Sequence, residues 1–192
     1  MAEWSSSMRL EDLDIAQVHR IYNVRMKEDF PPAELKALKI IEEGIQAGFY
    51  RFPGLFDGDE IIGYTGLIYH EDACLIDYLA VMPEWKNRGI GSVMLKLLKA
   101  YLKDTEYVIG EVEIPACGED EAERNLRSRR MDFYLRSGFY DTGMDVSVFG
   151  VRFRLLAFAD KPHDGQEILT RYRNIYRYVL PEDLFRNNVL TD

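Results

Sequence analysis

The stretch from Leu75 to Tyr101 limits the possible folds of this chain more than any other segment. Residues 75–81 (LIDYLAV) are mostly apolar, β-branched or aromatic, which favours a buried strand. Residues 82–88 form a polar connection. From Gly89 onward the apolar residues follow helical spacing: Ile90, Val93, Met94, Leu97, Leu98 and Tyr101. The sequence therefore predicts a strand, a glycine-containing loop and an amphipathic helix in direct succession.

A helix that starts directly after such a loop offers a site for an anion. The first backbone amides of a helix have no partner in the chain and point outward with partial positive charge. Gly89 and Gly91 have no side chain that would keep a phosphate away, and Lys86 and Arg88 add positive charge. We therefore expect a diphosphate to bind here. The alternative is an ordinary strand-to-helix turn whose glycines serve tight packing.

The spacing of this loop carries a family resemblance. The segment 86–91 (KNRGIG), after Leu-Ala-Val and before a helix, resembles the acyl-CoA loop of the GCN5-related N-acetyltransferase (GNAT) superfamily. The family places Arg or Gln where this chain has Lys86. The dinucleotide motif Gly-x-Gly-x-x-Gly fails because Met94 occupies its third glycine position. The resemblance implies that acetyl-CoA contacts Leu79, Ala80, Val81, Lys86, Asn87, Arg88, Gly89, Ile90, Gly91 and Ser92.

Composition limits the class of protein and of partner. A chain of 192 residues with 47% hydrophobic residues has the size of one compact domain. The net charge of −9 argues against nucleic acid as a partner and suits cationic acceptors such as amines. No apolar run approaches the roughly 20 residues of a membrane span, and residues 1–12 lack the apolar region of a signal peptide. We therefore expect no membrane partner and a cytoplasmic location.

Other residues predict no metal site and no nucleophilic cysteine. The three histidines are isolated in sequence, so no metal is expected. Cys74 and Cys117 lack metal-like spacing and are interpreted as buried thiols of a reducing compartment. Neither thiol is needed for an acyl transfer in which the amine attacks the thioester directly.

The resemblance, over about residues 10–158, implies an α+β fold with a mixed, mainly antiparallel central sheet flanked by helices. Residues 1–160 would form the acyltransferase domain, and residues 161–192 a helical extension packed on it. The expected elements are a helix capped by Asp12 or Asp14, a helix after Pro31-Pro32, a hairpin over 49–68, a strand over 107–114, a helix over 119–137, a hairpin over 139–158 and a helix before Pro181. The resemblance makes Asp29, Phe30 and Glu34 candidates for the acceptor pocket, with solvated loop residues as the alternative.

Three carboxylates are candidates for a catalytic base. Glu111 and Glu113 lie on one face of the strand predicted over 107–114. An amine arrives as an ammonium and must lose a proton before it attacks a thioester, which a carboxylate accepts directly or through a water. The alternative is a solvated strand face or ion pairs with the arginines that follow. Asp77 is a third candidate, because some relatives carry a catalytic histidine in that position.

A second signature lies in residues 133–139 (FYLRSGF), where Tyr134 stands one helical turn before a Gly-Phe pair. In the family this tyrosine lies beside the thioester sulfur, so the resemblance implies that Tyr134 is the general acid that protonates the departing thiolate. The alternative is a tyrosine of the core. Arg127 and Arg130 stand where relatives often have Asn and Ala. Arg130 is interpreted as a surface cation or as a group that binds an acidic part of a ligand.

Taken together, the sequence predicts an acetyl-CoA-dependent N-acetyltransferase acting on a small-molecule or peptide amine, as a monomer or a homodimer. The strand of Asp77 and that of Glu111 would separate at one end to admit the pantetheine arm. The Leu79 amide would stabilise the oxyanion, where one well-placed donor contributes about 3 kcal/mol. Two other classes stay open, a non-catalytic acyl-CoA sensor and a protein-interaction module on the same fold.

Overall fold

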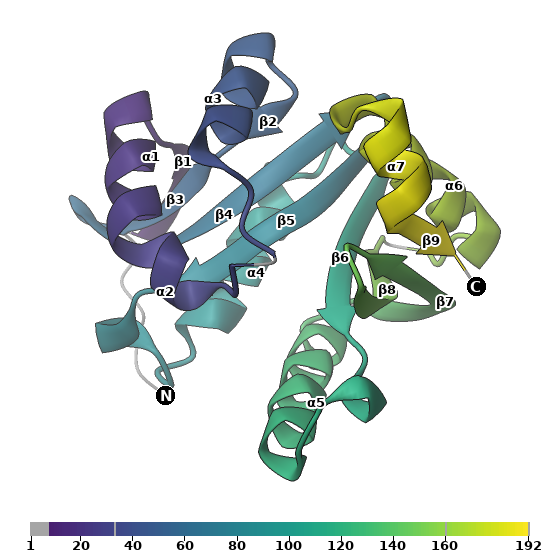
Figure 1. Cartoon of the computed structure of the whole chain (residues 1–192). Coiled ribbons are helices and arrows are strands. Elements are labelled where there is room, and N and C mark those ends of the chain that lie inside the picture. Colours follow the sequence, from purple (N-terminus) through teal and green to yellow (C-terminus); the bar gives the residue numbers. More distant parts are fainter. Residues whose placement is uncertain (1–7, 33, 160, 192) are drawn as a thin grey trace. The chain divides into compact units, whose positions relative to one another are not determined.

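The computed structural model describes residues 8–32, 34–159 and 161–191 (Figure 1). Two compact units make up the chain: unit 1 comprises Met1–Ile68 and Asp77–Lys103, and unit 2 comprises Tyr69–Ile76 and Asp104–Asp192. Strands in both units pair mainly in the antiparallel sense and are accompanied by helices. The predicted α+β class with a mixed, mainly antiparallel sheet flanked by helices is therefore confirmed.

The first four strands of the chain lie mainly in unit 1. Strand β1 (Met8–Asp12) runs antiparallel to β3 (Pro53–Asp57), and β3 runs antiparallel to β4 (Glu60–His70). The short β2 (Tyr50–Arg51) pairs with β4 as well. The predicted hairpin over 49–68 is thus present. Strand β1 was not predicted from the sequence, because its five residues are too few for a clear apolar alternation.

Helix α1 (Ile15–Ile21) continues through a π-helical turn (Tyr22–Met26) into α2 (Lys27–Asp29). Asp14, and not Asp12, caps it: the Asp14 carboxylate accepts from the amide of Gln17 over 2.8 Å, and the Gln17 side chain accepts from the Asp14 amide over 2.9 Å. This reciprocal pair is a capping box, which satisfies two backbone donors at the helix start.

Helix α3 (Leu38–Ala47) starts several residues later than expected from Pro31-Pro32. The reason lies in the peptide groups of Lys36. Its amide donates to the Tyr78 hydroxyl over 2.8 Å, and its carbonyl accepts from the Tyr22 hydroxyl over 2.9 Å. Because side chains hold both groups, the backbone at residue 36 has no need of helical hydrogen bonds.

Helix α4 (Ile90–Tyr101) begins where the sequence predicted, after the short 3-10 helix Pro83–Trp85. Its buried face packs into an apolar cluster of unit 1 formed by Leu55, Ile62, Ile90 and Met94, with Leu79, Val81 and Leu97 against it. Gly63 of β4 permits close packing here, because a Cβ at that position would lie 3.0 Å from the Ala80 carbonyl oxygen. This packing fixes the start of α4 relative to the unit 1 half of the strand that carries Asp77.

Unit 2 contains the parallel part of the sheet. Strand β5 (Ala73–Val81) begins in unit 2, where Ala73–Ile76 pair in parallel with Tyr107–Gly110 of β6 (Tyr107–Glu113). Strand β6 runs antiparallel to β8 (Val151–Phe158), β8 to β7 (Tyr140–Val148), and β7 to β9 (Val189–Thr191). The predicted strand over 107–114 and hairpin over 139–158 are present.

The helices of unit 2 are α5 (Glu121–Arg136), α6 (Gly165–Val179) and α7 (Glu182–Asn188). In Figure 1, α5 follows the end of β6 through the 3-10 turn Pro115–Cys117. Helix α6 buries Ile168, Leu169, Tyr172, Ile175 and Tyr176 against the strands of this unit. The C-terminal helix predicted before Pro181 therefore covers its apolar face within the chain.

One expectation for the thiols is wrong. Cys74 is buried in β5, but Cys117 is exposed, because it ends the 3-10 turn at the surface.

Over the described parts of the chain, no helix combines the length and apolar character needed to cross a bilayer. Within the same residues, no three His, Cys, Asp or Glu side chains are grouped so that they would hold a metal ion.

Candidate active site

The loop before α4 has the backbone geometry of a helix start that needs glycine. Gly89 is the N-cap residue of α4 and has φ 81°, in the left-handed region, and Asn87 has φ 61°. Glycine adopts this conformation at low cost, whereas a side chain there is strained. Among the residues that the structure describes, no side chain caps α4, and Ile90, the next residue, is buried. The local sequence thus places an uncapped helix N-terminus beside an anchored apolar residue.

Fewer amides are free at this N-terminus than the sequence analysis expected. The amides of Ser92 and Val93 both donate to the Gly89 carbonyl, over 3.1 and 3.3 Å. Helix geometry leaves the amides of Ile90 and Gly91 without an acceptor inside the helix. The dipole of α4 adds partial positive charge at the same point. The amides of residues 90 and 91 are therefore the donors best placed for an anion.

The two cations of the loop already have contacts within unit 1. The Lys86 ammonium lies 3.3 Å from a carboxylate oxygen of Asp29, and its side chain is 50% exposed. The Arg88 guanidinium lies over the Trp85 ring, 5.7 Å from its centre. A half-exposed ammonium moves at little cost, so Lys86 can exchange Asp29 for a ligand phosphate.

Asp29 is buried, which contradicts the alternative interpretation as a solvated loop residue. Its side chain is only 5% exposed and accepts from Arg25 over 2.9 Å and from the Tyr64 hydroxyl over 2.8 Å. Burial raises the pKa of Tyr64 well above its usual range, and the Asp29 charge raises it further. Tyr64 therefore stays protonated and donates to Asp29. Phe30 packs edge-on against Tyr64.

Asp77 lies in the unit 1 half of β5 and is equally enclosed, with 3% of its side chain exposed. One carboxylate oxygen pairs with the Lys36 ammonium, and the other accepts from the Tyr50 hydroxyl over 2.7 Å. The neighbouring Tyr78 donates to the Glu34 carbonyl over 2.9 Å and packs against Phe30, with ring centres 4.8 Å apart. Unit 1 thus brings two buried carboxylates and an aromatic cluster together.

Glu111 in β6 accepts hydrogen bonds from two tyrosines of α6. The hydroxyl of Tyr176 lies 2.8 Å from its Oε1 oxygen, and Tyr172 donates to the same oxygen. Burial raises the pKa of Tyr172 well above its usual range, and the carboxylate of Glu111 adds to this. The Tyr172 phenol is therefore a neutral donor at physiological pH. These partners were not predicted from the sequence, since 61 and 65 residues separate them from Glu111.

Glu113 forms the ion pairs that the sequence analysis kept as its alternative. The carboxylate lies 3.0 Å from Arg127 and 2.6 Å from Arg130, both on α5. Arg127, which is buried, also pairs with Glu123 over 2.6 Å. Arg130 is 48% exposed. Arg130 is therefore a surface cation of α5, one of the two interpretations from the sequence, and its charge is paired with Glu113.

Tyr134 lies on α5 within an aromatic group. Its ring contacts Phe133 and Phe139 edge-on, with ring centres 5.2 and 5.3 Å apart. Burial raises the pKa of Tyr134 to about 12, against a smaller lowering by the charge of Arg130. The phenol is therefore protonated at physiological pH, as a proton or hydrogen-bond donor must be.

The predicted site residues are divided between the units. Unit 1 contains Asp77, the β5 residues Leu79, Ala80 and Val81, and the loop residues 86–92. Unit 2 contains Glu111, Glu113 and Tyr134. Within unit 1 the loop and the β5 residues share the apolar cluster under α4. Within unit 2 the two glutamates have separate partners, tyrosines for Glu111 and arginines for Glu113.

Comparison with known proteins points to one family. The model of the acetyltransferase (GNAT) family matches residues 15–139. No curated protein sequence matches the chain. Among solved structures, a putative acetyltransferase of the GNAT family from Bacteroides thetaiotaomicron is 22% identical, with 89% of this chain and 98% of that chain covered and a TM-score of 0.69.

Two further similar structures contain the co-substrate or its product. The PaiA N-acetyltransferase from Thermoplasma acidophilum, in complex with coenzyme A, is 17% identical over 79% of this chain and 98% of that chain, with a TM-score of 0.55. A GNAT family acetyltransferase from Elizabethkingia anophelis, with acetyl-CoA bound, is 15% identical over 80% and 99%, with a TM-score of 0.52. At these identities the likeness concerns the fold.

Proposed function

The chain belongs to the acetyltransferase (GNAT) family, and on this premise we propose that it transfers an acetyl group from acetyl-CoA to the nitrogen of a small-molecule or peptide amine. The observation that carries the proposal is the uncapped start of α4, where Gly89 has φ 81° and precedes the amides of Ile90 and Gly91. These amides would bind the diphosphate of the co-substrate. Membership of this family supports CoA as the ligand of this helix start.

We propose that the pantetheine arm runs along the backbone of Leu79, Ala80 and Val81. Arg88 and Lys86 would supply charge to the phosphates, with Asn87 in the connecting turn. Arg88, whose guanidinium lies over the Trp85 ring, directly precedes the N-cap residue Gly89 in the sequence. The amide of Leu79 is the proposed donor to the oxyanion. One hydrogen bond in this role lowers the activation free energy by about 3 kcal/mol.

Of the three candidate bases, we favour Glu111. Glu113 is paired with Arg127 and Arg130, and Asp77 is paired with Lys36. Protonation of either would remove a counter-charge from these buried or half-buried cations, which is costly. In its contacts with Tyr172 and Tyr176, Glu111 binds phenols and not cations, so protonation would break no ion pair in these two contacts. This supports Glu111 as the group that accepts a proton from the acceptor ammonium.

Tyr134 is the proposed general acid. Its raised pKa keeps the hydroxyl protonated, but also makes full proton transfer to a thiolate unfavourable in the resting state, because thiols have a pKa of about 8.5. We therefore propose that Tyr134 acts first as a hydrogen-bond donor to the developing thiolate and transfers its proton late. Cys74 and Cys117 have no role in this mechanism.

Co-substrate binding is tested by thermal unfolding of the chain during titration with CoA. A ligand at 100 times its dissociation constant stabilises a protein by about 2.7 kcal/mol, so a clear rise in Tm is expected. Gly89→Ala should abolish this rise. Gly58→Ala is the matched control. Gly58 has φ 59° in the β3–β4 turn of the same unit, and a Cβ there, as at Gly89, would meet no other atom within 4 Å. This control should lower Tm in the absence of ligand and leave the CoA-dependent rise intact.

Catalysis is tested by a screen of amines for acetyl-CoA-dependent thiol release. Tyr134→Phe should lose turnover and keep its affinity for CoA. Glu111→Gln should lower kcat by about 10²–10⁴, the usual contribution of a positioned base, whereas Glu113→Gln and Asp77→Asn should lower it less. CoA binding without turnover on any amine would favour an acyl-CoA sensor. Absence of CoA binding would favour a protein-interaction module.

A further inference from the structure

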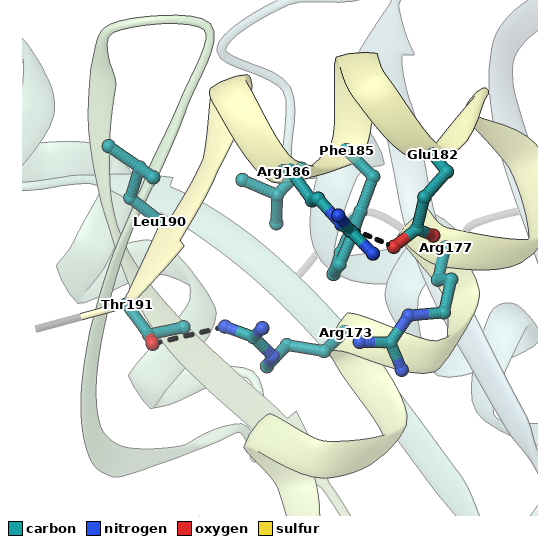
Figure 2. A pocket seen from close by; sticks show the side chains of 8 residues that line it. Arg173, Arg177, Glu182, Phe185, Arg186, Leu190 and Thr191 are labelled. Atoms are coloured by element: carbon teal, nitrogen blue, oxygen red, sulfur yellow. Dashed lines mark hydrogen bonds and ion pairs between the residues drawn. The ribbon is translucent and has the colours of Figure 1, made fainter.

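The C-terminal part of unit 2 contains a hollow lined by three arginines (Figure 2). Its volume is about 420 Å³, and it lies where α6, α7 and β9 meet. Cavities of about 300–1,000 Å³ suit small molecules. We call it the arginine pocket, after Arg173, Arg177 and Arg186. It lies outside residues 15–139, which the family model matches, so the proposed acyl transfer does not account for it.

Two of the arginines are held together on one aromatic ring. Arg173 and Arg177 stand one turn apart on α6, and their guanidinium carbons lie 5.4 and 4.7 Å from the centre of the Phe185 ring. Like charges at this helical spacing repel one another. The π-face of Phe185 offsets part of that repulsion. The pocket therefore keeps two cations near one another at its wall.

The positive charge of the pocket is not neutralised by its own lining. Glu182, the one carboxylate among the lining residues, pairs with Arg186 over 2.7 Å. Arg173 donates to the Thr191 hydroxyl over 3.1 Å, a neutral partner. Among the described residues, neither Arg173 nor Arg177 has a carboxylate in ion-pair distance. Three arginines and one carboxylate leave a surplus of two positive charges, in a chain whose net charge is −9.

We propose that the arginine pocket binds a small organic phosphate monoester. A guanidinium presents parallel N–H donors that fit phosphate oxygens two at a time. A phosphate monoester carries a charge of about −1.5 to −2 at neutral pH, which matches the surplus of the pocket. Phe185 and Leu190 supply an apolar wall for the organic group of the ester. A carboxylate with one charge would leave one arginine uncompensated.

The test is calorimetric titration of the whole chain with phenyl phosphate at constant ionic strength. The protein is saturated with 3′-dephospho-CoA, which carries the diphosphate but no phosphate monoester, so that the loop before α4 is already occupied. We expect one saturable site. Arg177→Gln and Arg173→Gln should each weaken binding by about tenfold or more, because each removes charge-assisted hydrogen bonds. Arg129→Gln is the matched control: it removes the same charge from an exposed position on α5 and should leave the affinity unchanged.

Three results would overturn the proposal: no saturable binding at millimolar phenyl phosphate, unchanged affinity in both pocket variants, or an equal loss in Arg129→Gln. Arg177→Lys should bind between wild type and Arg177→Gln, since it keeps the charge and loses the paired donors. Circular dichroism checks that each variant is folded. If the chain does not bind dephospho-CoA, the titration without it has the same outcomes, because the pocket variants identify the site independently of the proposed acyl transfer.

Discussion

Tyr176 donates a hydrogen bond to Glu111 over 2.8 Å, although 65 residues separate the two in the sequence. Tyr172, one turn earlier on α6, donates to the same carboxylate oxygen. The candidate base on β6 is thus held by a helix that lies beyond the part of the chain matched by the family model. In this protein helix α6 supplies two hydrogen-bond donors to the proposed catalytic carboxylate.

Tyr172→Phe should destabilise the protein by about 1.5–3 kcal/mol, the range for a lost hydrogen bond to a charged group. The side chain of Tyr172 is fully buried, so no water replaces its hydroxyl. Urea unfolding measures the change. A double-mutant cycle with Glu111→Gln should show a coupling of about 0.5–3 kcal/mol. Strictly additive effects would mean that the two side chains do not interact.

Glu113→Gln should cost more stability than Arg130→Gln. Removal of Glu113 takes one of two carboxylate partners from the buried Arg127, whose remaining carboxylate partner is Glu123. The loss should lie near the lower end of the about 3–5 kcal/mol seen for broken buried pairs. Arg130 is half exposed, so its loss should cost about 0–1 kcal/mol. Chemical denaturation compares the two, and equal costs would refute the assignment of Glu113 to a buried pair.

Tyr134 should make the stability fall with rising pH above about 10. Its pKa is about 12 in the folded protein and 10 as the ordinary value, so the folded state keeps a proton that the unfolded state has lost. This contribution to stability is complete below pH 10 and is lost as the pH rises through 12. In unfolding curves taken across that interval, Tyr134→Phe should show a shallower decline than wild type. Parallel declines would contradict the raised pKa.

Cys117 should react with a thiol reagent in the folded protein, and Cys74 should not. Cys117 is exposed on the 3-10 turn, whereas Cys74 is buried in β5. Titration with a chromogenic disulfide should therefore detect one fast thiol natively and a second after denaturation. Cys117→Ala should remove the fast thiol and preserve turnover, since the proposed mechanism has no covalent enzyme intermediate. A loss of turnover in this variant would contradict direct attack of the amine.

Local patterns in the sequence predicted most of the elements, for reasons that are themselves local. The helical spacing from Ile90 to Tyr101 predicted α4, and the hairpin predicted over residues 49–68 contains β3 and β4. Helix α3 started late, because the hydroxyls of Tyr22 and Tyr78 bind the backbone of Lys36. Tyr78 stands 42 residues away from Lys36, so no window of sequence contains this competition.

The candidate site shows the same limit more strongly. The loop before α4 was predictable, because its glycines and its helix are neighbours in sequence. The partners of the carboxylates were not: Lys36 and Tyr50 lie 41 and 27 residues from Asp77. Alternation along β6 placed Glu111 and Glu113 on one face, but it did not indicate that tyrosines bind one and arginines the other. Side-chain pairing over long separations decides which acid is available as a base.

The pairing of β9 with β7 and the burial of the α6 face have a consequence for where the chain can be shortened. A protein cut after residue 160 would keep every segment that the family model recognises, yet β7 would present an unpaired edge to solvent. The surface left by Ile168, Tyr172 and Ile175 would become an open apolar patch. Such a shortened chain should self-associate, so the limit of family similarity is no guide to the smallest fragment that stays monodisperse.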